Sequence, residues 1–253
     1  MRYFSTLLRH ELHQLFVAPA TYVAAVLFVI SMGVIYLFSL LSFSQAPREG
    51  LPALLFFSAF WAPALFAVPL LTMKSIAEER RLGTLEALLS TPASPVAIVL
   101  SKFLSAYLFY LLLWGLTLAF PFIVRWGLRH VAVDVRLMDP SILIGGYGFV
   151  ATSGVLFIAF GIFASSLTRS QLVAGMMTFS GLSLIILGGR LAQELPLLEM
   201  GWLQVAQPFV EYLQSFEHLE DFSRGIIDTR PFVYYLSSAS LLLILAMSDV
   251  AAE

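Results

Sequence analysis

The residues that could carry chemistry are few and scattered along this 253-residue sequence. Two of its four histidines lie close together, in the run HELH at 10–13, and the other two are His130 and His218. The run differs from the zinc-binding pattern H-E-x-x-H because its second histidine comes one residue too early. Histidines three positions apart on an amphipathic helix are more often surface decoration, so we expect no metal site.

Nucleophilic catalysis and nucleotide binding are equally unsupported by the sequence. The chain contains no cysteine, which excludes disulfides, thiolate metal sites and cysteine nucleophiles. Neither of its two lysines, Lys74 and Lys102, follows a glycine-rich loop of the kind that cradles phosphates in ATPases. We therefore expect a chain that is not an enzyme and holds no cofactor of its own.

The composition is that of a membrane protein. Hydrophobic residues make up 59% of the chain and charged residues only 12%, with a mean hydropathy of +0.89. A soluble domain carries about a quarter charged residues, so a single soluble core is disfavoured. The net charge of −2 also leaves no electrostatic footprint for a nucleic-acid partner. The lipid bilayer is the partner that this composition predicts.

Long gaps between charged residues predict where the chain crosses that bilayer. A membrane-spanning helix needs about 20 apolar residues, and it must satisfy its own backbone hydrogen bonds. The sequence therefore predicts an all-α integral membrane protein with six spans. These spans lie near residues 18–42, 52–73, 98–124, 142–167, 171–189 and 231–248.

The interiors of the spans give further expectations. We treat Lys102 as the charged residue that bounds one of the charge-free gaps. On that basis we expect no ionisable side chain inside any span, which disfavours a proton-coupled transporter. Pro63 and Pro69 should kink the second span. Small residues recur every seven positions in the fourth and fifth spans, and we expect them to pack these spans within one subunit rather than to form a dimer seam. They are Gly154, Gly161, Ala174, Gly181 and Gly188.

Residues 1–17 precede the first span and show an amphipathic pattern. Apolar side chains such as Leu8 and Leu15 share one helical face, opposite Arg9 and Gln14. This pattern predicts a helix lying on the membrane surface, with an ordinary extension of the first span as the alternative. Lysines and arginines divide equally between the two predicted sides, so the charges alone leave the orientation open.

The run AEERRLGTLEALLSTPASP at 77–95 concentrates charge between two apolar spans. Glu78 and Arg81 lie one helical turn apart and can pair, and Gly83 should then end that first short helix. Thr84 is predicted to cap a second short helix at its N-terminus. Glu86 falls in the first turn of that helix, where a negative charge is favoured.

The second short helix also has an apolar face, formed by Leu85, Leu88 and Leu89. Pro92 should end it, and Ser94 followed by Pro95 should begin the third span. A simple solvated turn needs no such face, so we expect a surface that a partner protein covers rather than a turn alone.

This run resembles the cytoplasmic coupling segment of ABC-2-type transporter permeases, whose pattern is close to E-E-R-x-x-G-T-x-E-x-L-L-x-x-P. The resemblance implies that residues 74–95 contact an ATPase subunit. The residues carried over to that contact are Glu78, Glu79, Arg80, Gly83, Thr84, Glu86, Leu88 and Leu89.

A second stretch, FEHLEDFSRGIIDTRPFVYYLS at 216–237, resembles one branch of that family. The branch contains permeases of the gliding-motility type and of the nitrous-oxide-reductase-accessory type. Residues Arg224, Gly225, Asp228 and Arg230 match the branch pattern and have no assigned role. A turn held by an Asp–Arg pair is the simpler interpretation of them.

The family resemblance also implies an assembly and an orientation. It implies a multi-pass protein of the bacterial inner membrane with both termini in the cytoplasm, so that residues 43–50, 125–140 and 190–230 lie outside. Two ATPase subunits would bind ATP and Mg²⁺, and a second permease copy or a homologue would complete the pathway. The outer segment 190–230 is too short for an enzyme domain.

Three functions are consistent with this sequence. The first is the export of a substrate, and spans without charge would suit lipids or other hydrophobic molecules. In the second, the same machine moves no solute and passes mechanical work to an extracytoplasmic companion protein. The third, a lipid-modifying membrane enzyme, is disfavoured because no paired carboxylates, histidine cluster or nucleophile lies at membrane depth.

Overall fold

The structure is a computed structural model, and it describes residues 2–45, 52–91, 93–127, 140–194, 218–219, 221–222 and 229–252. Within these residues every regular element is a helix. Most of the segment 190–230 lies outside the described residues, as do the connecting segments 46–51 and 128–139.

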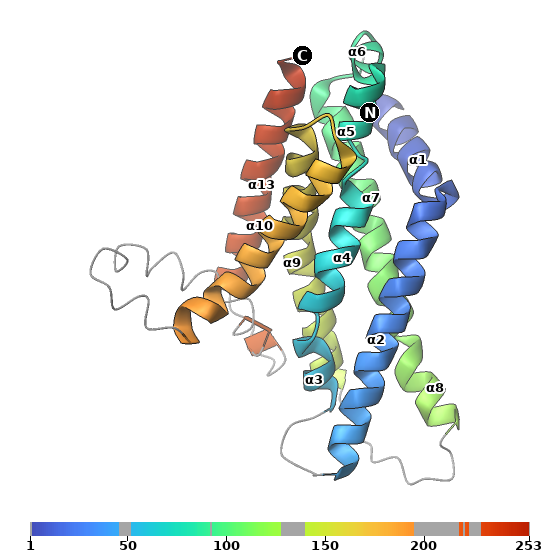
Figure 1. The fold of residues 1–253 in the computed structure, drawn as a ribbon, viewed down its shortest axis with the longest axis vertical. Coiled ribbons are helices and arrows are strands. Elements are labelled where there is room, and N and C mark those ends of the chain that lie inside the picture. The colour runs from blue at the N-terminus through green and yellow to red at the C-terminus, as the bar shows by residue number, and fades with distance from the viewer. Residues whose placement is uncertain are drawn as a thin grey trace, which may run out of the picture.

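Eleven labelled helices account for most of the described chain (Figure 1). In chain order they are α1 (Arg2–Val17), α2 (Pro19–Gln45), α3 (Pro52–Ser58), α4 (Trp61–Thr72), α5 (Ala77–Leu82), α6 (Thr84–Leu89), α7 (Pro95–Thr117), α8 (Ala119–Gly127), α9 (Pro140–Ser166), α10 (Gln171–Glu194) and α13 (Thr229–Ala251).

Five of the six predicted spans correspond to helices that are long and apolar enough to cross a membrane. They are α2, the pair α7 and α8 up to Ile123, α9, α10 up to Gly188, and α13. Ala18 is the only residue between α1 and α2. Helix α2 begins at Pro19, because proline has no N–H to donate and is tolerated at the first position of a helix.

The predicted second span, 52–73, is two helices rather than one kinked helix. Helix α3 ends at Ser58 and α4 begins at Trp61, with a turn at 59–60 between them. The break falls where Pro63 would push against the carbonyl group four residues earlier, at Ala59. Pro69, by contrast, lies inside α4 without ending it.

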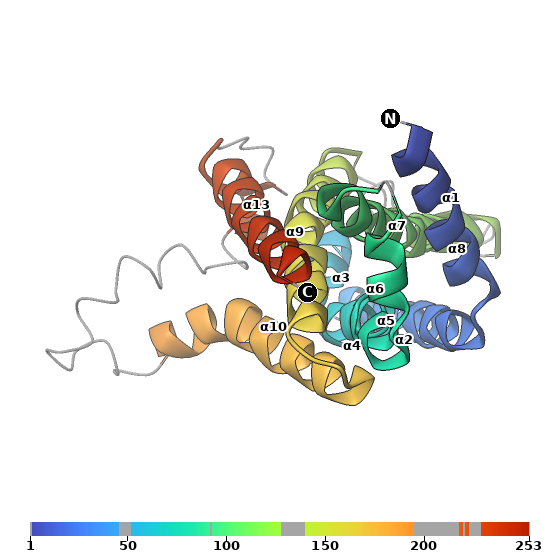
Figure 2. The same cartoon turned by 90° about the horizontal axis from the view of Figure 1, so that it is seen from above.

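Helix α9 is the centre of the bundle. It packs against α4, α7, α10 and α13, and Figure 2 shows it surrounded by them. Of its span, 61% is buried, against 22% for α10, which runs along the outside. Aromatic rings fill the space around α9. Phe60, in the turn before α4, meets Phe149 of α9 edge to face with 5.0 Å between ring centroids.

Glycines allow the helices to approach α9 closely. A Cβ atom at Gly154 would overlap the ring of Tyr110 on α7, and one at Gly161 would overlap Thr72 on α4. On α10, a Cβ atom at Gly181 would overlap Phe160 of α9. Gly181 packs α10 against α9, as the sequence predicted for the fourth and fifth spans. The two glycines on α9 receive α7 and α4 instead of α10. Gly188 has no such neighbour among the described residues.

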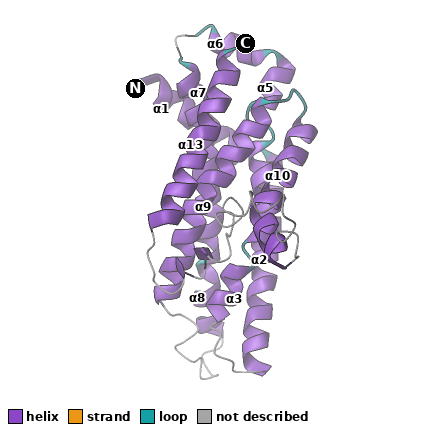
Figure 3. Cartoon of the chain, turned by 90° about the vertical axis from the view of Figure 1, so that its left-hand side faces the viewer, coloured by secondary structure: helices purple, strands orange, loops and turns teal. Residues whose placement is uncertain are grey.

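Both chain ends lie at the same end of the bundle as α5 and α6 (Figure 1). The view from the side in Figure 3 shows the same grouping. The chain therefore brings residues from its beginning, its middle and its end to one surface, around the run 77–91.

We predict that α6 and residue 224 are on opposite sides of the membrane. Because the chain has no cysteine, single engineered cysteines report cleanly. A membrane-impermeant thiol reagent applied from outside should label Arg224→Cys, in the predicted outer segment, and should spare Glu86→Cys. Glu86 is exposed in the structure, so protection there would reflect the membrane and not burial. The reverse pattern would contradict the predicted topology.

We predict that Gly154→Val destabilises the protein and that Gly188→Val does not. Valine at 154 would drive into Tyr110, which is fully buried and has no room to move, and overpacking of this kind costs about 1–3 kcal/mol. The same valine at 188 meets no atom within 4 Å among the described residues. Thermal unfolding in detergent should separate the two variants, and equal melting temperatures would contradict the packing described here.

Candidate functional site

The run that resembles a coupling segment forms two short helices joined at Gly83. Helix α5 ends there and α6 begins at the next residue. Gly83 has φ of 69°, in the left-handed region that residues with a side chain rarely adopt. Its N–H donates to the carbonyl oxygen of Arg80, which closes α5.

The predicted cap by Thr84 is wrong. Gly83 occupies the N-cap position of α6 and offers no side chain for a hydrogen bond. Because α6 begins directly at Thr84, the threonine hydroxyl points back over α5 and donates to the carbonyl oxygen of Glu79 at 3.3 Å. Thr84 therefore joins the two short helices instead of capping one of them.

Two other local predictions are confirmed. Arg81 and Glu78 form an ion pair of 3.7 Å along the surface of α5. Ser94 caps α7, where its hydroxyl accepts a hydrogen bond of 3.2 Å from the N–H of Ala97. Pro92, which was predicted to end the second short helix, lies outside the described residues.

The beginning of α5 is held by α9. The N–H groups of Ile76 and Ala77 donate to the hydroxyl oxygen of Ser165, at 3.1 and 3.0 Å. Ile76 is the N-cap residue of α5, and its own side chain has no oxygen that could accept these bonds. Ser165 thus supplies the cap from a helix almost ninety residues further along the chain.

Arg80 joins α5 to two further places on the bundle. Its Nη2 lies 3.0 Å from Oδ2 of Asp249, near the end of α13. Its Nη1 donates to the carbonyl oxygen of Ser166, the last residue of α9. Only 8% of the arginine side chain is exposed, so this guanidinium lies inside the protein.

Lys102 lies at the centre of a buried ion cluster. Its Nζ is 2.6 Å from Oε1 of Glu79 on α5 and 2.7 Å from Oε1 of Glu11 on α1. The lysine side chain is 2% exposed. The expectation that no span contains an ionisable group is therefore wrong at Lys102, which lies within α7 and is stabilised there by two carboxylates.

The carboxyl group of Glu79 is the least satisfied member of this cluster. Its Oε2 is buried and has no hydrogen-bond partner among the described residues. Burial raises the pKa of Glu79 above its ordinary value, and the neighbouring Lys102 only partly counteracts that rise. The bond to Lys102 holds Glu79 in place, although removing the Glu79 carboxylate from water costs free energy.

The apolar face of α6 points partly into the protein. Leu85 is fully buried, and Leu88 and Leu89 are half-buried, so the expectation of a fully exposed apolar face is wrong at Leu85. The residues that do face outward lie around the bend between the two short helices. They include Leu82, Gly83, Thr84 and Glu86, beside the exposed Arg81 and Ala87.

Five of the sequence-predicted contact residues form two groups, while Glu78, Leu88 and Leu89 are half-buried and belong to neither. Glu79 and Arg80 are bound to the bundle, whereas Gly83, Thr84 and Glu86 are exposed. We call the first two the anchor residues and the last three the outward bend.

Sequence reasoning missed the residues that bind the 74–95 segment to the bundle, directly or through Lys102. They are Glu11, Lys102, Ser165, Ser166 and Asp249. One signal was present, because a lysine inside a predicted span requires a carboxylate partner.

The branch-pattern residues are only partly described. Arg230 is exposed in the first turn of α13, and Arg224, Gly225 and Asp228 lie outside the described residues.

In the HELH run, His10 Nε2 lies 2.9 Å from Nε2 of Gln14. Among the residues that the structure describes, no three potential metal ligands gather at one place.

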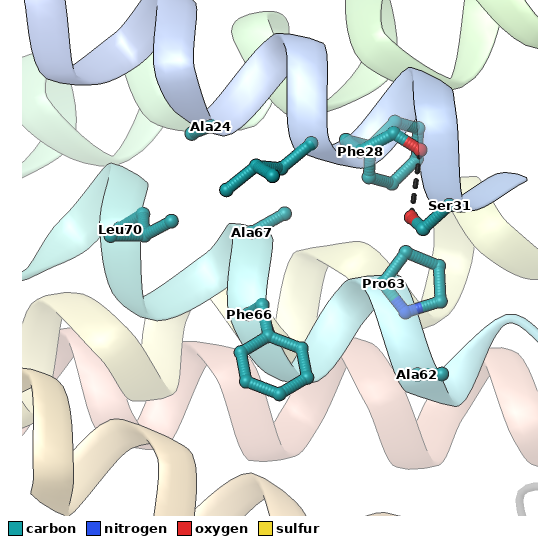
Figure 4. A pocket seen from close by; sticks show the side chains of 9 residues that line it. Ala24, Phe28, Ser31, Ala62, Pro63, Phe66, Ala67 and Leu70 are labelled. Carbon is teal, nitrogen blue, oxygen red and sulfur yellow. Dashed lines mark hydrogen bonds between the residues drawn. The ribbon is translucent and has the colours of Figure 1, made fainter.

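A cavity of about 320 Å³ lies between α2 and α4 (Figure 4). Its lining is apolar, with Phe28 and Leu70 on opposite helices, and Leu27 and Phe66 beside it largely exposed. The one hydroxyl in the lining, that of Ser31, donates to the carbonyl oxygen of Phe28. The described lining therefore offers contacts to hydrocarbon and none to a charged solute.

The fold and the site together define an all-α, multi-pass membrane protein with a short two-helix segment bound to one end of its bundle. The sequence from 5 to 251 matches the family described as ABC-2 family transporter protein, and the chain belongs to that family. It is accordingly a permease subunit of an ABC-2 transporter, a class that works with an ABC ATPase. A comparison with curated protein sequences found no match.

We predict that Ser165→Ala loosens the 74–95 segment. The substitution leaves the buried N–H groups of Ile76 and Ala77 without their acceptor, at a cost of about 1–3 kcal/mol. Amide exchange at 76 and 77 should become faster, and the melting temperature should fall. Ser90→Ala is the matched control, because the Ser90 hydroxyl is exposed and donates within its own turn, to the carbonyl oxygen of Ala87. Unchanged exchange in Ser165→Ala would contradict this role.

Proposed function

We propose that this permease couples ATP hydrolysis in two separate ATPase subunits to export or to mechanical work across the bacterial inner membrane. ATP and Mg²⁺ would be bound by the ATPases. A second permease copy or a homologue would complete the assembly, since each chain carries one 74–95 segment and the ATPases of this class close as pairs. Both termini and this segment would lie in the cytoplasm.

One observation carries the proposal, namely that the segment is bonded to the ends of several spans while its bend stays exposed. Arg80 reaches α9 and α13, Glu79 reaches α7, and Ser165 of α9 caps α5. An ATPase that pushed on the outward bend would therefore move these helices with it. Coupling requires an element of this kind, one that contacts both sites and differs between two global states.

The work done by the assembly has two versions. Export of a hydrophobic molecule is favoured by the apolar character of the spans and by the apolar cavity between α2 and α4. Mechanotransmission to an extracytoplasmic companion is favoured by the stretch 216–237, which resembles the gliding-motility and nitrous-oxide-reductase-accessory branch. Co-purification of an extracytoplasmic protein with the complex would favour mechanotransmission.

We predict that Glu86→Lys and Gly83→Pro uncouple the complex while the permease still inserts. A lysine at 86 places a positive charge in the first turn of α6, costing about 0.5–1 kcal/mol locally, and inverts the charge offered to the ATPase. Proline at 83 holds φ near −65°, whereas the bend requires a φ of 69°. The measurement is the rise in ATPase rate when the permease is added to its ATPase subunits.

Both variants should lose that rise. Glu217→Lys makes the same charge change in the predicted outer segment and should keep it. Wild-type stimulation in both Glu86→Lys and Gly83→Pro would argue against a coupling role for the outward bend.

A further inference from the structure

Three helices that are far apart in the sequence meet at one ammonium group. Lys102 lies in α7, seven residues after Pro95 and roughly 10 Å along the helix axis. It binds Glu11 from α1 and Glu79 from α5. We propose that Lys102 is a positioning residue that makes the N-terminal helix α1 part of the coupling unit, so that α1 and the 74–95 segment move as one body.

The packing of these helices explains why the ion cluster has this effect. Helix α1 packs chiefly against α7 and α2, while α5 packs chiefly against α6 and α10. Apolar contacts therefore fix α1 and α5 to different neighbours. The Glu11–Lys102–Glu79 cluster is the described connection that joins the two helices through hydrogen-bonded charges.

The chemistry of the cluster makes the connection stiff. A lysine ammonium has three donors on one atom, so Nζ binds both carboxylates at once at 2.6 and 2.7 Å. The carboxylates are also mostly buried, with 12% of the Glu11 side chain and 23% of the Glu79 side chain exposed. Water competes poorly for such a site, and removing one partner leaves a charge that the surroundings cannot solvate.

The cluster also links the segment to the first span. Phe16, one turn and a half beyond Glu11 on α1, meets Phe109 of α7 edge to face at 5.4 Å. Helix α2 then begins after Ala18. A displacement of α5 that is passed to α1 therefore reaches α2, a helix that the segment itself does not contact through the anchor residues.

This inference rests on the proposed function only for its consequence in the complex, because the cluster can be examined in the permease alone. Spin labels at His13→Cys and Leu82→Cys would report the distance between α1 and α5, since both positions are exposed. In the otherwise unchanged permease we expect a narrow distance distribution. Glu11→Ala should broaden it, because α1 then loses its bond to Lys102.

A second variant guards against simple misfolding. Replacing all three members at once, by Glu11→Gln, Lys102→Met and Glu79→Gln, removes every charge of the cluster and leaves no ion buried without a partner. It should broaden the distribution as Glu11→Ala does. Arg9→Ala is the control, because it removes an exposed charge from the same helix. A distribution as narrow as that of the control in Glu11→Ala would overturn the proposal, whatever the triple variant does.

The complex supplies the second readout. With Mg-ATP, Glu11→Ala should lower the permease-dependent rise in ATPase rate by about fivefold or more, at the lower end of typical coupling effects, and Arg9→Ala should not. An unchanged rise in Glu11→Ala would also count against the proposal. If the wild-type permease produces no rise at all, the proposed function fails, and the label distances still decide whether Lys102 joins α1 to α5.

Discussion

The structure depends on one constraint, which is that polar and charged groups shielded from water must find their partners inside the protein. The 74–95 segment lies against the ends of apolar helices, so its buried backbone N–H groups and its inward-facing charges cannot rely on solvent. Ser165 accepts from the backbone of α5, Asp249 and the carbonyl of Ser166 bind Arg80, and Lys102 binds Glu79. These bonds, together with the buried side chains of Ile76, Ala77 and Leu85, hold the segment against the bundle.

The course of the spans could be predicted because the bilayer imposes a length and excludes charge. Gaps between charged residues placed α2, α9, α10 and α13 to within a few residues, since apolar composition alone decides whether a helix can cross. The prediction of a single helix over 52–73 was wrong, because a proline disrupts the helix about one turn before its own position. The sequence shows Pro63, but the chain breaks at 59–60.

The candidate site was predictable only where its bonds are local. Glu78 and Arg81 are separated by one turn, and Ser94 precedes Pro95, so spacing alone predicted both interactions. Lys102 and Glu11 are 91 positions apart, and Arg80 and Asp249 are 169 apart. No periodicity connects residues at such separations, and their pairing follows from the way the helices pack. Glu11 was hidden for a further reason, because the run HELH directs attention to its histidines rather than to its carboxylate.

The ion pair between Arg80 and Asp249 has a consequence for biosynthesis. A chain is made from its N-terminus, so the arginine emerges from the ribosome well before its carboxylate, which lies near the C-terminal end of the last helix. Ser165 and Ser166 emerge between the two. The segment therefore reaches its bonded position in stages, and it is complete only when α13 has entered the bundle. A chain cut short before α13 has no Asp249, so Arg80 loses one of the bonds that hold α5 to the bundle and keeps its bond to Ser166 of α9.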